Sequence, residues 1–373
     1  MTEKGLTSRA RLHSIQGRTN GLLRLAAVWV DERTGLGKPL DALLNYPVSL
    51  QVQKNALYLL GSLAFASFML QMFSGFLLII YYTPALDSAY NSVDYINYIL
   101  PLGWLVRGIH VYNASAIFVL TFLHLLRTFF TSAYKKPREI TWLSGVVLML
   151  VTAVFAFTGA LLPWDQDGYW ATVVGVNIAG STPLLGNWLM HLMRGGAHLG
   201  QVTLTRFYFV HTVIMPGILV ALIALHVSQL RHGPARATSQ RGKALSYKFV
   251  PFFPYRMFVH ILAGLGLSIL LIYLSWHQRA PLDFPADPTD TSFTPRPEWY
   301  FLSLFQLIHY FPGRLEPIAT QLIPMLIIGG MFLLPFVDRN SEHRPWPKPV
   351  LTVIALFIIT MMLVLTFLAL ATE

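Results

Sequence analysis

The stretch WLVRGIHVYNASAIFVLTFLHLLRTFFTSAY, residues 104–134, decides the fold of this chain. It is long enough to cross a bilayer as one helix, yet its apolar body contains His110 and His124. Fourteen helical residues separate these histidines by about 21 Å, roughly two-thirds of a hydrocarbon core. At about 100° per residue they also lie within about 40° of one face. One helix therefore offers two nitrogen ligands at two membrane depths.

A second stretch, RFYFVHTVIMPGILVALIALHVSQLRHG at residues 206–233, repeats this arrangement. His211 and His226 stand fifteen residues apart, about 22 Å, with a net rotation of about 60°. Pro216 lies between them, and we expect it to kink or rewind the helix. Two such helices can form two bis-histidine sites, one near each membrane face.

A single histidine in a membrane helix is most often a satisfied core or cavity residue, but two pairs of near-equal spacing favour ligands. The chain has no cysteine, and no carboxylate pair accompanies the histidines. This donor set suits haem iron better than zinc or a di-iron centre. The absence of cysteine also excludes disulfides, thiolate metal sites and a covalently attached c-type haem.

The composition is that of a polytopic membrane protein. Of the 373 residues, 54% are hydrophobic and 12% charged, about half the charge of a soluble protein, and the mean hydropathy is +0.54. Seven membrane spans are predicted, at residues 55–82, 105–131, 142–162, 208–230, 257–277, 317–337 and 349–371. We expect four domains: an N-terminal arm (1–53) with an interfacial helix at 21–30, a four-helix di-haem domain (54–231), a linker (232–250), and a three-helix domain (251–373).

The distribution of positive charge predicts the orientation. The N-terminal arm and alternate loops carry 21 Lys and Arg residues, and the opposite loops carry 6. The positive-inside rule then puts the N-terminus in the cytoplasm and the C-terminus outside, and we expect a multi-pass protein of a bacterial cytoplasmic (inner) membrane. The net charge of +10 is thus a topology signal and not the mark of a nucleic-acid partner. His110 should pair with His211 near the outer face, and His124 with His226 near the inner face.

Glycines and arginines accompany these histidines. Two glycine pairs have the ligands' own spacing of fourteen, and each could let a backbone approach a flat macrocycle at the two depths: Gly61, Gly75, Gly145 and Gly159. Four arginines near the pairs are candidate propionate partners, although arginines at the interface are as common: Arg107, Arg127, Arg206 and Arg231.

Two outer loops form a second group of candidates. LLPWDQDGYW (161–170) opens a 45-residue connection of the aromatic, Gly-rich kind that is usually functional. Farther on, Pro297-Glu298-Trp299-Tyr300 meets an apolar segment. A carboxylate there can have a raised pKa and exchange protons with a ligand in an apolar pocket, although an ordinary surface carboxylate is the other interpretation.

At these motifs the chain resembles cytochrome b of the quinol:cytochrome c (or plastocyanin) oxidoreductases, and most closely the b6f branch. Residues 50–231 resemble the b6 subunit through GWLVRGIH, KKPREITW, TGALLPWDQDGYW and MRGGAHLGQVTLTRFYFVHT. Residues 251–371 resemble subunit IV through PADP, PEWY and FLSLFQ. The b6 type has its second histidine pair fifteen apart, as here. The eighth helix of the mitochondrial type is absent.

The resemblance implies two non-covalent haem b groups, a low-potential one on His110 and His211 and a high-potential one on His124 and His226. It implies a Q cycle, with quinol oxidised outside, electrons carried across the membrane, and quinone reduced inside. It also implies a Rieske-type iron–sulfur protein and a c-type cytochrome as partners, in a homodimeric complex. The quinol pocket would be formed by Pro163, Trp164, Pro297, Glu298, Trp299 and Tyr300, with Glu298 and Tyr300 as catalytic residues.

Two positions depart from the family. The cysteine that attaches an extra haem in b6 falls at Leu59, which leaves only a non-covalent third haem open. Many relatives have Tyr where this chain has Ala160. The quinone type remains open, and Arg231, His232 and Asp41 are only positional candidates for the inner site. The rival hypotheses are a di-haem membrane anchor, as in hydrogenase or formate dehydrogenase complexes, and a transporter or structural subunit that uses histidine for packing.

Overall fold

The computed structural model of the chain describes residues 47–49, 56–232, 249–251, 256–290, 292–338 and 349–371. Within these ranges the regular secondary structure is helical, apart from one antiparallel pair of short strands, β1 (Pro47–Ser49) and β2 (Phe249–Pro251). Seven helical stretches are long and apolar enough to cross a membrane, which confirms the predicted fold class. The N-terminal arm and the linker lie almost wholly outside the described residues.

Four spans belong to the N-terminal part of the chain and three to the C-terminal part. The first four consist of η1 (Ala56–Leu59) with α5 (Leu60–Ile79), α7 (Gly103–Phe130), α8 (Glu139–Ala160), and α11 (Gln201–Phe209) with η2 (Val210–Ile214) and α12 (Met215–His232). The last three are α13 (Met257–His277), η5 (Gly313–Leu315) with η6 (Ile318–Leu322) and α15 (Ile323–Val337), and α16 (Pro349–Ala371).

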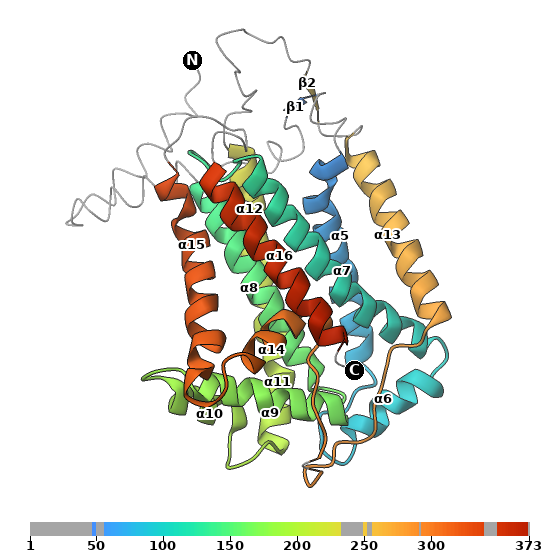
Figure 1. Ribbon diagram of the computed structural model, residues 1–373. Helices are drawn as coiled ribbons and strands as arrows, with labels where there is room; N and C mark the ends of the chain where they lie inside the picture. Colours follow the sequence, from blue (N-terminus) through green and yellow to red (C-terminus); the bar gives the residue numbers. More distant parts are fainter. Residues whose placement is uncertain are drawn as a thin grey trace, which may run out of the picture.

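The connecting segments give the bundle two different ends (Figure 1). The lower end carries α6 (Ala89–Tyr98), α9 (Gln166–Gly180) and α10 (Gly186–Arg194). Two further short helices, η4 (Trp299–Phe301) and α14 (Leu302–His309), lead from the loop after α13 back into the bundle. The upper end carries β1 and β2 and the first residues of α5 and α13. The predicted fourth span begins earlier than expected, at Gln201 and not at 208, because α11 continues through η2 into α12.

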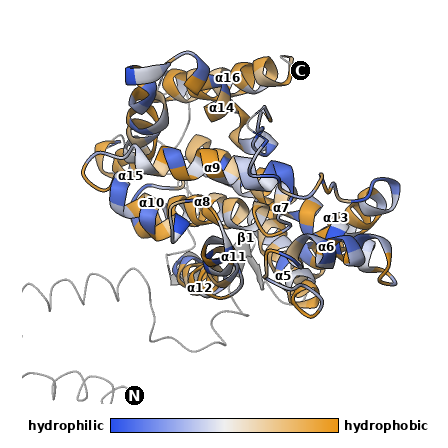
Figure 2. Cartoon of the chain, turned by 90° about the horizontal axis from the view of Figure 1, so that it is seen from below, coloured by the Kyte–Doolittle hydropathy of each residue, from blue (hydrophilic) through white to orange (hydrophobic). Residues whose placement is uncertain are grey.

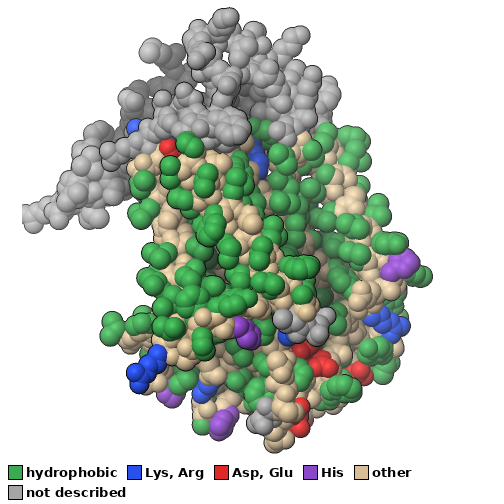
Figure 3. All heavy atoms as spheres, viewed as in Figure 1, with side chains coloured by type: hydrophobic (Ala, Val, Ile, Leu, Met, Phe, Trp, Pro, Cys, Tyr) green, Lys and Arg blue, Asp and Glu red, His purple; other side chains and the backbone are tan. Residues whose placement is uncertain are grey.

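Helix pairs organise the bundle. α5 packs against α7, α8 packs against α12, and α13 packs against both α7 and α5. α14 contacts α16, and α15 contacts α8. Seen from below, α14 and α16 lie on the opposite side of the bundle from α12 and α5 (Figure 2). Side chains at mid-height are mostly hydrophobic, and charged side chains gather at the lower end (Figure 3). This belt matches the apolar core of a bilayer.

A buried polar network joins α5 to α7. The amide of Asn113 is fully buried and donates to the Ser67 carbonyl at 2.8 Å and to Gln71 Oε1 at 2.8 Å. The Ser67 hydroxyl also bonds Asn113, and Gln71 Nε2 donates to the His110 carbonyl at 3.1 Å. Interhelical hydrogen bonds of this kind hold membrane helices together where water is absent. The network fixes the register of α5 against the helix that carries His110 and His124.

The fourth span changes its winding at its first histidine. Residues 210–214, which include His211, form the π-helical turn η2, and Pro216 lies two residues after its last residue. Proline removes the N–H that an α-helix would use there, and a π turn accommodates one additional residue. The fifteen residues from His211 to His226 therefore turn about as far as fourteen α-helical residues. Both ligand helices thus present their histidines in the same phase.

Candidate functional site

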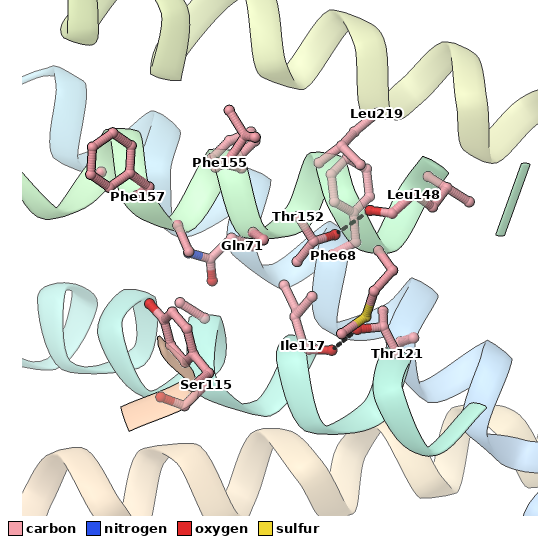
Figure 4. Close-up of a pocket in the computed structure, with 18 of the residues that line it drawn as sticks. Phe68, Gln71, Ser115, Ile117, Thr121, Leu148, Thr152, Phe155, Phe157 and Leu219 are labelled. Atoms are coloured by element: carbon pink, nitrogen blue, oxygen red, sulfur yellow. Dashed lines mark hydrogen bonds between the residues drawn. The ribbon is translucent and has the colours of Figure 1, made fainter. Parts of the chain in front are cut away.

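A single cavity connects the two ends of the bundle. It has a volume of about 2490 Å³ and is lined by α5, α7, α8, α12, α13 and the segment around residues 295–308. Pockets for one small ligand usually measure about 300–1,000 Å³, so this cavity has room for several groups. Its middle is lined by Phe68, Ile117, Leu148, Phe155 and Leu219, while Thr121 and Thr152 bond carbonyls of their own helices (Figure 4).

The four predicted histidines line this cavity as two facing pairs. His110 on α7 faces His211 on η2, with ring centroids 6.4 Å apart and planes at 70°. His124 on α7 faces His226 on α12, with ring centroids also 6.4 Å apart and planes at 72°. The first pair lies toward the lower end of the bundle and the second toward the upper end, which is the predicted pairing.

The pair geometry fits one metal between each two rings. A metal–imidazole bond of about 2.0 Å, with each nitrogen about 1.1 Å from its ring centroid, would put two rings that share one metal about 6.2 Å apart. Among the described residues, no group of three or more His, Cys, Asp or Glu side chains could hold a bare metal ion. Two axial imidazoles with no further protein ligand suit an iron whose other four ligands come from a macrocycle.

Three of the four rings have a hydroxyl partner at Nδ1. Each hydroxyl belongs to the residue just before one of the predicted glycines, and each also bonds the carbonyl three residues earlier in its helix. The Nδ1 contacts are Ser74 to His110 at 3.0 Å, Ser144 to His226 at 3.0 Å, and Thr158 to His211 at 3.2 Å. A hydrogen bond at Nδ1 orients the ring and leaves Nε2 for the metal.

His124 differs from the other three histidines. Its Nδ1 is buried and has no hydrogen-bond partner among the described residues. The residue before Gly61 is Leu60, which carries no hydroxyl. The upper pair therefore has one oriented ring and one that is held by packing alone.

The four glycines lie directly against the four rings. A Cβ built on each glycine would meet the Cε1 atom of one histidine: 2.6 Å for Gly159 and His211, 2.9 Å for Gly61 and His124, 3.0 Å for Gly75 and His110, and 3.3 Å for Gly145 and His226. A side chain at any of these positions would push the imidazole out of place. The glycines accordingly make room for the ligand rings themselves, at both depths.

The predicted arginines do not form one group. Arg127 lines the cavity near the upper pair, and its guanidinium lies over the Tyr58 ring, 3.8 Å from the centroid. Arg107 also lines the cavity, but it donates to the backbone carbonyls of Ala280 at 2.8 Å and Pro281 at 2.6 Å. Arg107 thus clamps the segment that leaves α13.

Within the part of the chain that the structure describes, neither of the other two predicted arginines, Arg206 and Arg231, is placed beside a histidine pair. Arg206 does not line the cavity; it donates to the carbonyls of His191 at 3.3 Å and Leu192 at 2.6 Å, near the end of α10. The structure therefore does not bring Arg206 together with the histidine pair. Arg231 belongs to the last turn of α12, and its side chain lies outside the described residues, as do the side chain of His232 and the whole of Asp41.

The Pro297-Glu298-Trp299-Tyr300 segment borders the lower part of the same cavity. Trp299 Nε1 donates to Ser115 Oγ of α7 at 3.1 Å. The Tyr300 ring stacks on Phe118 of α7, with centroids 4.6 Å apart and planes at 20°. These contacts fix the segment against α7 between the depths of His110 and His124.

Glu298 lines the cavity and has acidic neighbours. Burial raises the pKa of its carboxyl group, and the charges of Asp167 and Asp165 raise it further. Burial likewise raises the pKa of the Tyr300 hydroxyl, and Glu298 adds to the shift. A carboxyl group with a raised pKa on the wall of a partly apolar cavity is suited to exchange protons with a bound ligand.

The turn after α8 meets the segment after α13. Asp165 caps α9 by accepting from the Gly168 N–H at 3.0 Å, and Gln166 N–H donates to the Phe284 carbonyl at 2.8 Å. The Ala286 N–H donates to the carbonyl of Trp164 at 3.1 Å. Pro163 lines the cavity, whereas Trp164 is buried behind it against Tyr169. The predicted pocket residue Trp164 thus supports the wall of the cavity and does not form it.

Several residues at the site were not predicted from the sequence. They are the three hydroxyl residues Ser74, Ser144 and Thr158, and the carboxylates Asp165, Asp167 and Asp283, which line the lower end of the cavity. The hydroxyls had a signal in the sequence, because each directly precedes a glycine with ligand spacing. The carboxylates come from two segments far apart in the chain, and the sequence does not indicate that they meet.

Fold and site together define a class: a helical membrane protein that holds two facing histidine pairs at two depths of one cavity. Residues 43–233 match the family "cytochrome b/b6/petB", and residues 285–373 match "cytochrome b(C-terminal)/b6/petD". The chain belongs to the cytochrome b family, as the cytochrome b subunit of a bc-type complex. This confirms the resemblance expected from the motifs, and members of the family bind haem b.

Similar proteins cover the chain over most of its length. The cytochrome bc complex cytochrome b subunit of Chlorobaculum thiosulfatiphilum is 32% identical over 91% of this chain and 80% of its own. The cytochrome b of Rickettsia conorii is 33% identical over 85% of this chain and 80% of its own. Cytochrome b6 of Gracilaria tenuistipitata var. liui is 38% identical over 54% of this chain and 94% of its own.

A solved structure agrees with the sequence relatives. The hyperthermophilic respiratory Complex III superposes with a TM-score of 0.76 at 28% identity, covering 91% of this chain and 90% of its own. The similarity therefore includes both the four-helix part and the three-helix part.

Proposed function

We propose that this chain is the di-haem subunit of a quinol:cytochrome c (or plastocyanin-type) oxidoreductase, with quinol oxidised at the lower end of the cavity and quinone reduced at the upper end. The observation that carries the proposal is the two histidine pairs, each with ring centroids 6.4 Å apart, in the same cavity as Glu298. A site that only stored electrons would need the pairs but not the carboxyl group of Glu298 on the cavity wall.

The proposed haem-binding residues follow from the geometry. His110 and His211 would hold one haem b, and His124 and His226 the second, both without covalent attachment. When bound, each haem takes up and passes on one electron at a time. The four glycines leave room for the rings, and the Ser and Thr hydroxyls orient three of them. Leu59 offers no thiol, so a third haem at the upper end would also be non-covalent.

Fewer arginines are proposed as partners of the haem propionates than the four that the sequence suggested. Arg127 is the best candidate, because it lines the cavity beside His124 and its Nε has no hydrogen-bond partner among the described residues. Arg107 is the candidate near the lower pair. Two of its guanidinium nitrogens already donate to backbone carbonyls, so a propionate there could bind only the remaining N–H groups. Arg231 remains a proposal from the sequence, and we assign Arg206 to the support of α10.

Glu298 is the proposed proton acceptor for quinol. An ionised carboxylate on the wall of a partly apolar cavity can accept a hydrogen bond from the quinol hydroxyl and then its proton. Tyr300 and Trp299 are fixed against α7, so they shape the pocket around the ring of the quinol. Asp167 is exposed at the same end and can pass the proton on to solvent.

The chain forms one subunit of the proposed enzyme, and partner subunits supply the rest. We propose a multisubunit complex with a Rieske-type iron–sulfur protein and a c-type cytochrome, assembled as a homodimer. The lower end would face the outside of a bacterial cytoplasmic membrane, with the N-terminus in the cytoplasm. The four-helix part (54–231) would hold the haems, and the part from 251 to 373 would supply Glu298. A di-haem membrane anchor is not favoured, because the match to the family extends over residues 285–373.

Replacing Glu298 tests the proposal in membranes that contain the whole complex. Glu298→Gln should slow quinol-driven reduction of the b-type optical signal by about 100-fold or more, because general-base catalysis is lost while both histidine pairs remain. Glu316→Gln is a matched control, since Glu316 does not line the cavity. Unchanged quinol oxidation in Glu298→Gln would contradict the proposal, and a wild-type protein without any b-type absorption would refute the haem assignment.

A further inference from the structure

One side chain just outside the cavity joins the two segments that form its lower end. Gln166 begins α9, directly after the turn that lines the cavity with Pro163 and Asp165, and its side chain is buried. Both ends of its amide group bond the loop that follows α13: Oε1 accepts from the Asp287 N–H at 2.7 Å, and Nε2 donates to Asp290 Oδ2 at 3.3 Å. Gln166 does not line the cavity, and the proposed function does not use it.

Backbone hydrogen bonds reinforce this connection. The Gln166 N–H donates to the Phe284 carbonyl at 2.8 Å, and the Ala286 N–H donates to the Trp164 carbonyl at 3.1 Å. Together they form an isolated antiparallel bridge between the turn after α8 and the loop after α13. The Gln166 side chain extends this contact from the bridge to Asp290, so the loop lies against the start of α9 over several residues.

Asp290 connects this contact to the segment that leads to Glu298. Its Oδ2 is the acceptor for the glutamine amide, and its Oδ1 accepts from the N–H of Ser292 at 3.1 Å and from the hydroxyl of the same residue at 2.6 Å. Pro295 and Pro297 follow, and both line the cavity together with Glu298. Proline fixes φ and stiffens the chain, so we expect a displacement at Asp290 to reach Glu298.

The other side of Glu298 is fixed against α7. Trp299 Nε1 donates to Ser115 Oγ at 3.1 Å, and the Tyr300 ring stacks on Phe118. Glu298 therefore belongs to a segment that is held at both ends, by the start of α9 on one side and by α7 on the other. A misplacement of about 1 Å can cost an enzyme about 100-fold in rate, so the path of this segment matters for a proton acceptor.

We propose that Gln166 is a positioning residue for quinol oxidation: its amide group holds residues 287–290 against the start of α9 and thereby sets where the Glu298 carboxyl group lies in the cavity. This rests on the proposed function, in which Glu298 accepts the proton of the quinol. Gln166 lies behind the cavity wall and acts through Glu298. An amide is suited to this role because it accepts from an N–H and donates to a carboxylate at the same time.

Exchanging donor and acceptor tests the contact between Gln166 and Asp290. Gln166→Glu keeps an acceptor for the Asp287 N–H, but it sets two carboxylates against each other and removes the donor. Adding Asp290→Asn supplies an amide donor and removes the like charge, while the amide oxygen can still accept from Ser292. The double variant Gln166→Glu/Asp290→Asn therefore restores the hydrogen bond in the opposite direction.

Two further variants complete the set. Gln166→Leu removes both side-chain contacts at once. Gln201→Glu is the matched control, because Gln201 also bonds a loop at the lower end but does not line the cavity. Its side chain accepts from the Leu86 N–H at 3.0 Å and donates to the Pro84 carbonyl at 2.9 Å, and both partners belong to the loop after α5.

The rate of quinol-driven reduction of the b-type signal, per b-type centre, is measured over a range of quinol concentrations in membranes that contain the whole complex. Gln166→Leu and Gln166→Glu should lower kcat by about tenfold or more and change KM by no more than about twofold, because Trp299 and Tyr300 stay fixed against α7. The double variant should return to within about threefold of wild type, and Gln201→Glu should match wild type. The number of b-type centres verifies that each variant assembles.

A second pair of substitutions tests whether Gln166 acts through Glu298. In a Glu298→Gln background, Gln166→Glu should slow the reaction no further, because no carboxylate remains to be positioned. A residue that supported the fold in general would add its own loss to that of Glu298→Gln.

The inference is overturned if Gln166→Leu oxidises quinol within about twofold of wild type, if the double variant stays as slow as Gln166→Glu, or if the losses from Gln166→Glu and Glu298→Gln multiply. Failure of the proposed function looks different, because Glu298→Gln itself then oxidises quinol at the wild-type rate, whatever residue stands at position 166.

Discussion

At the lower end of the cavity, a histidine pair lies near four carboxylates, and the arginine beside it is held by backbone carbonyls. At the upper end, a pair with the same ring distance lies among arginines and lysines. The glycine and histidine arrangement is repeated, while the surrounding charge is reversed. Acidic groups suit the release of protons from a ligand, and basic groups suit their uptake. The same arrangement of histidines and glycines thus stands in two opposite charge environments.

The two ends also differ in how their rings are held. Both rings of the lower pair have hydroxyl partners, and His211 Nδ1 has the Phe155 carbonyl in addition, at 3.1 Å. In the upper pair only His226 has a hydroxyl partner, from Ser144. The lower pair is therefore the more rigid of the two, and the following substitutions test this difference.

Removing one ligand from each end should have the largest effect. His211→Leu should abolish the lower b-type centre and leave the upper one, and His226→Leu should do the reverse, because each pair shares no ligand with the other. Haem content and low-temperature reduced-minus-oxidised spectra of the two purified variants measure this. Loss of both centres in either variant would show that the two ends are not independent.

The second-largest effect is expected from a methyl group added beside one ring at each end, which should destabilise the lower site more than the upper site. Gly159→Ala would place Cβ 2.6 Å from His211 Cε1, whereas Gly145→Ala would place it 3.3 Å from His226 Cε1. We expect a loss of about 1–3 kcal/mol of stability at the lower site and less than about 1 kcal/mol at the upper site. Haem retention during denaturant titration gives both values. Equal losses would mean that the rings shift freely at both ends.

Removing the hydroxyl group that contacts a histidine ring should change the midpoint potential of the proposed haem more at the upper end than at the lower end. Ser144→Ala takes away the hydroxyl partner of His226 at 3.0 Å, and Thr158→Val takes away the longer hydroxyl contact of His211 at 3.2 Å. Each ring keeps a backbone partner, Thr141 for His226 and Phe155 for His211. A net hydrogen bond of about 0.5–1.5 kcal/mol corresponds to about 20–60 mV for one electron. We expect Ser144→Ala to raise the midpoint potential of the upper centre by that amount, and Thr158→Val to shift the lower one less. Redox titration of each variant is the measurement, with wild type as control.

The smallest expected effect concerns the acidic neighbours of Glu298. The negative charge of Asp167 raises the pKa of Glu298, so Asp167→Asn should lower it. Glu298 would then ionise at lower pH, and the acid limb of the quinol-oxidation profile would move to lower pH. Asp87→Asn, at an exposed carboxylate of the same end, is the control. A shift toward higher pH would show that the limb reports another group.

The sequence predicted the membrane fold and the facing of the four histidines in pairs well, because both depend on local periodicity. Apolar runs define the spans, and histidines spaced by fourteen and fifteen residues lie near one face of their helix, with the π-helical turn η2 correcting the phase of the second pair. Glycines at the same spacing were predicted to lie close to the site, and they do, although they contact the imidazoles. These features require only that the helices form and stand side by side.

Contacts between distant segments were less predictable. Arg107 and Arg206 lie near histidines in the chain, but both donate to backbone carbonyls that their own sequence context does not indicate. Trp164 has a positive φ of 54° and turns into the core, which a motif cannot indicate. The hydrogen-bonding choices of long side chains depend on loop paths, and loop paths are set by tertiary contacts. Roles for individual arginines therefore cannot be assigned from spacing alone.

The π-helical turn at Val210–Ile214 has a consequence for comparing such proteins. A helix that accommodates one additional residue in a π-helical turn keeps its two histidines on the same face, although the number of residues between them has changed. The number of residues between two histidines therefore does not give their difference in membrane depth. Inserting or deleting one residue near Pro216 need not change how His211 faces His110. Such a turn lets the number of residues between two histidines change while both rings still face the same cavity.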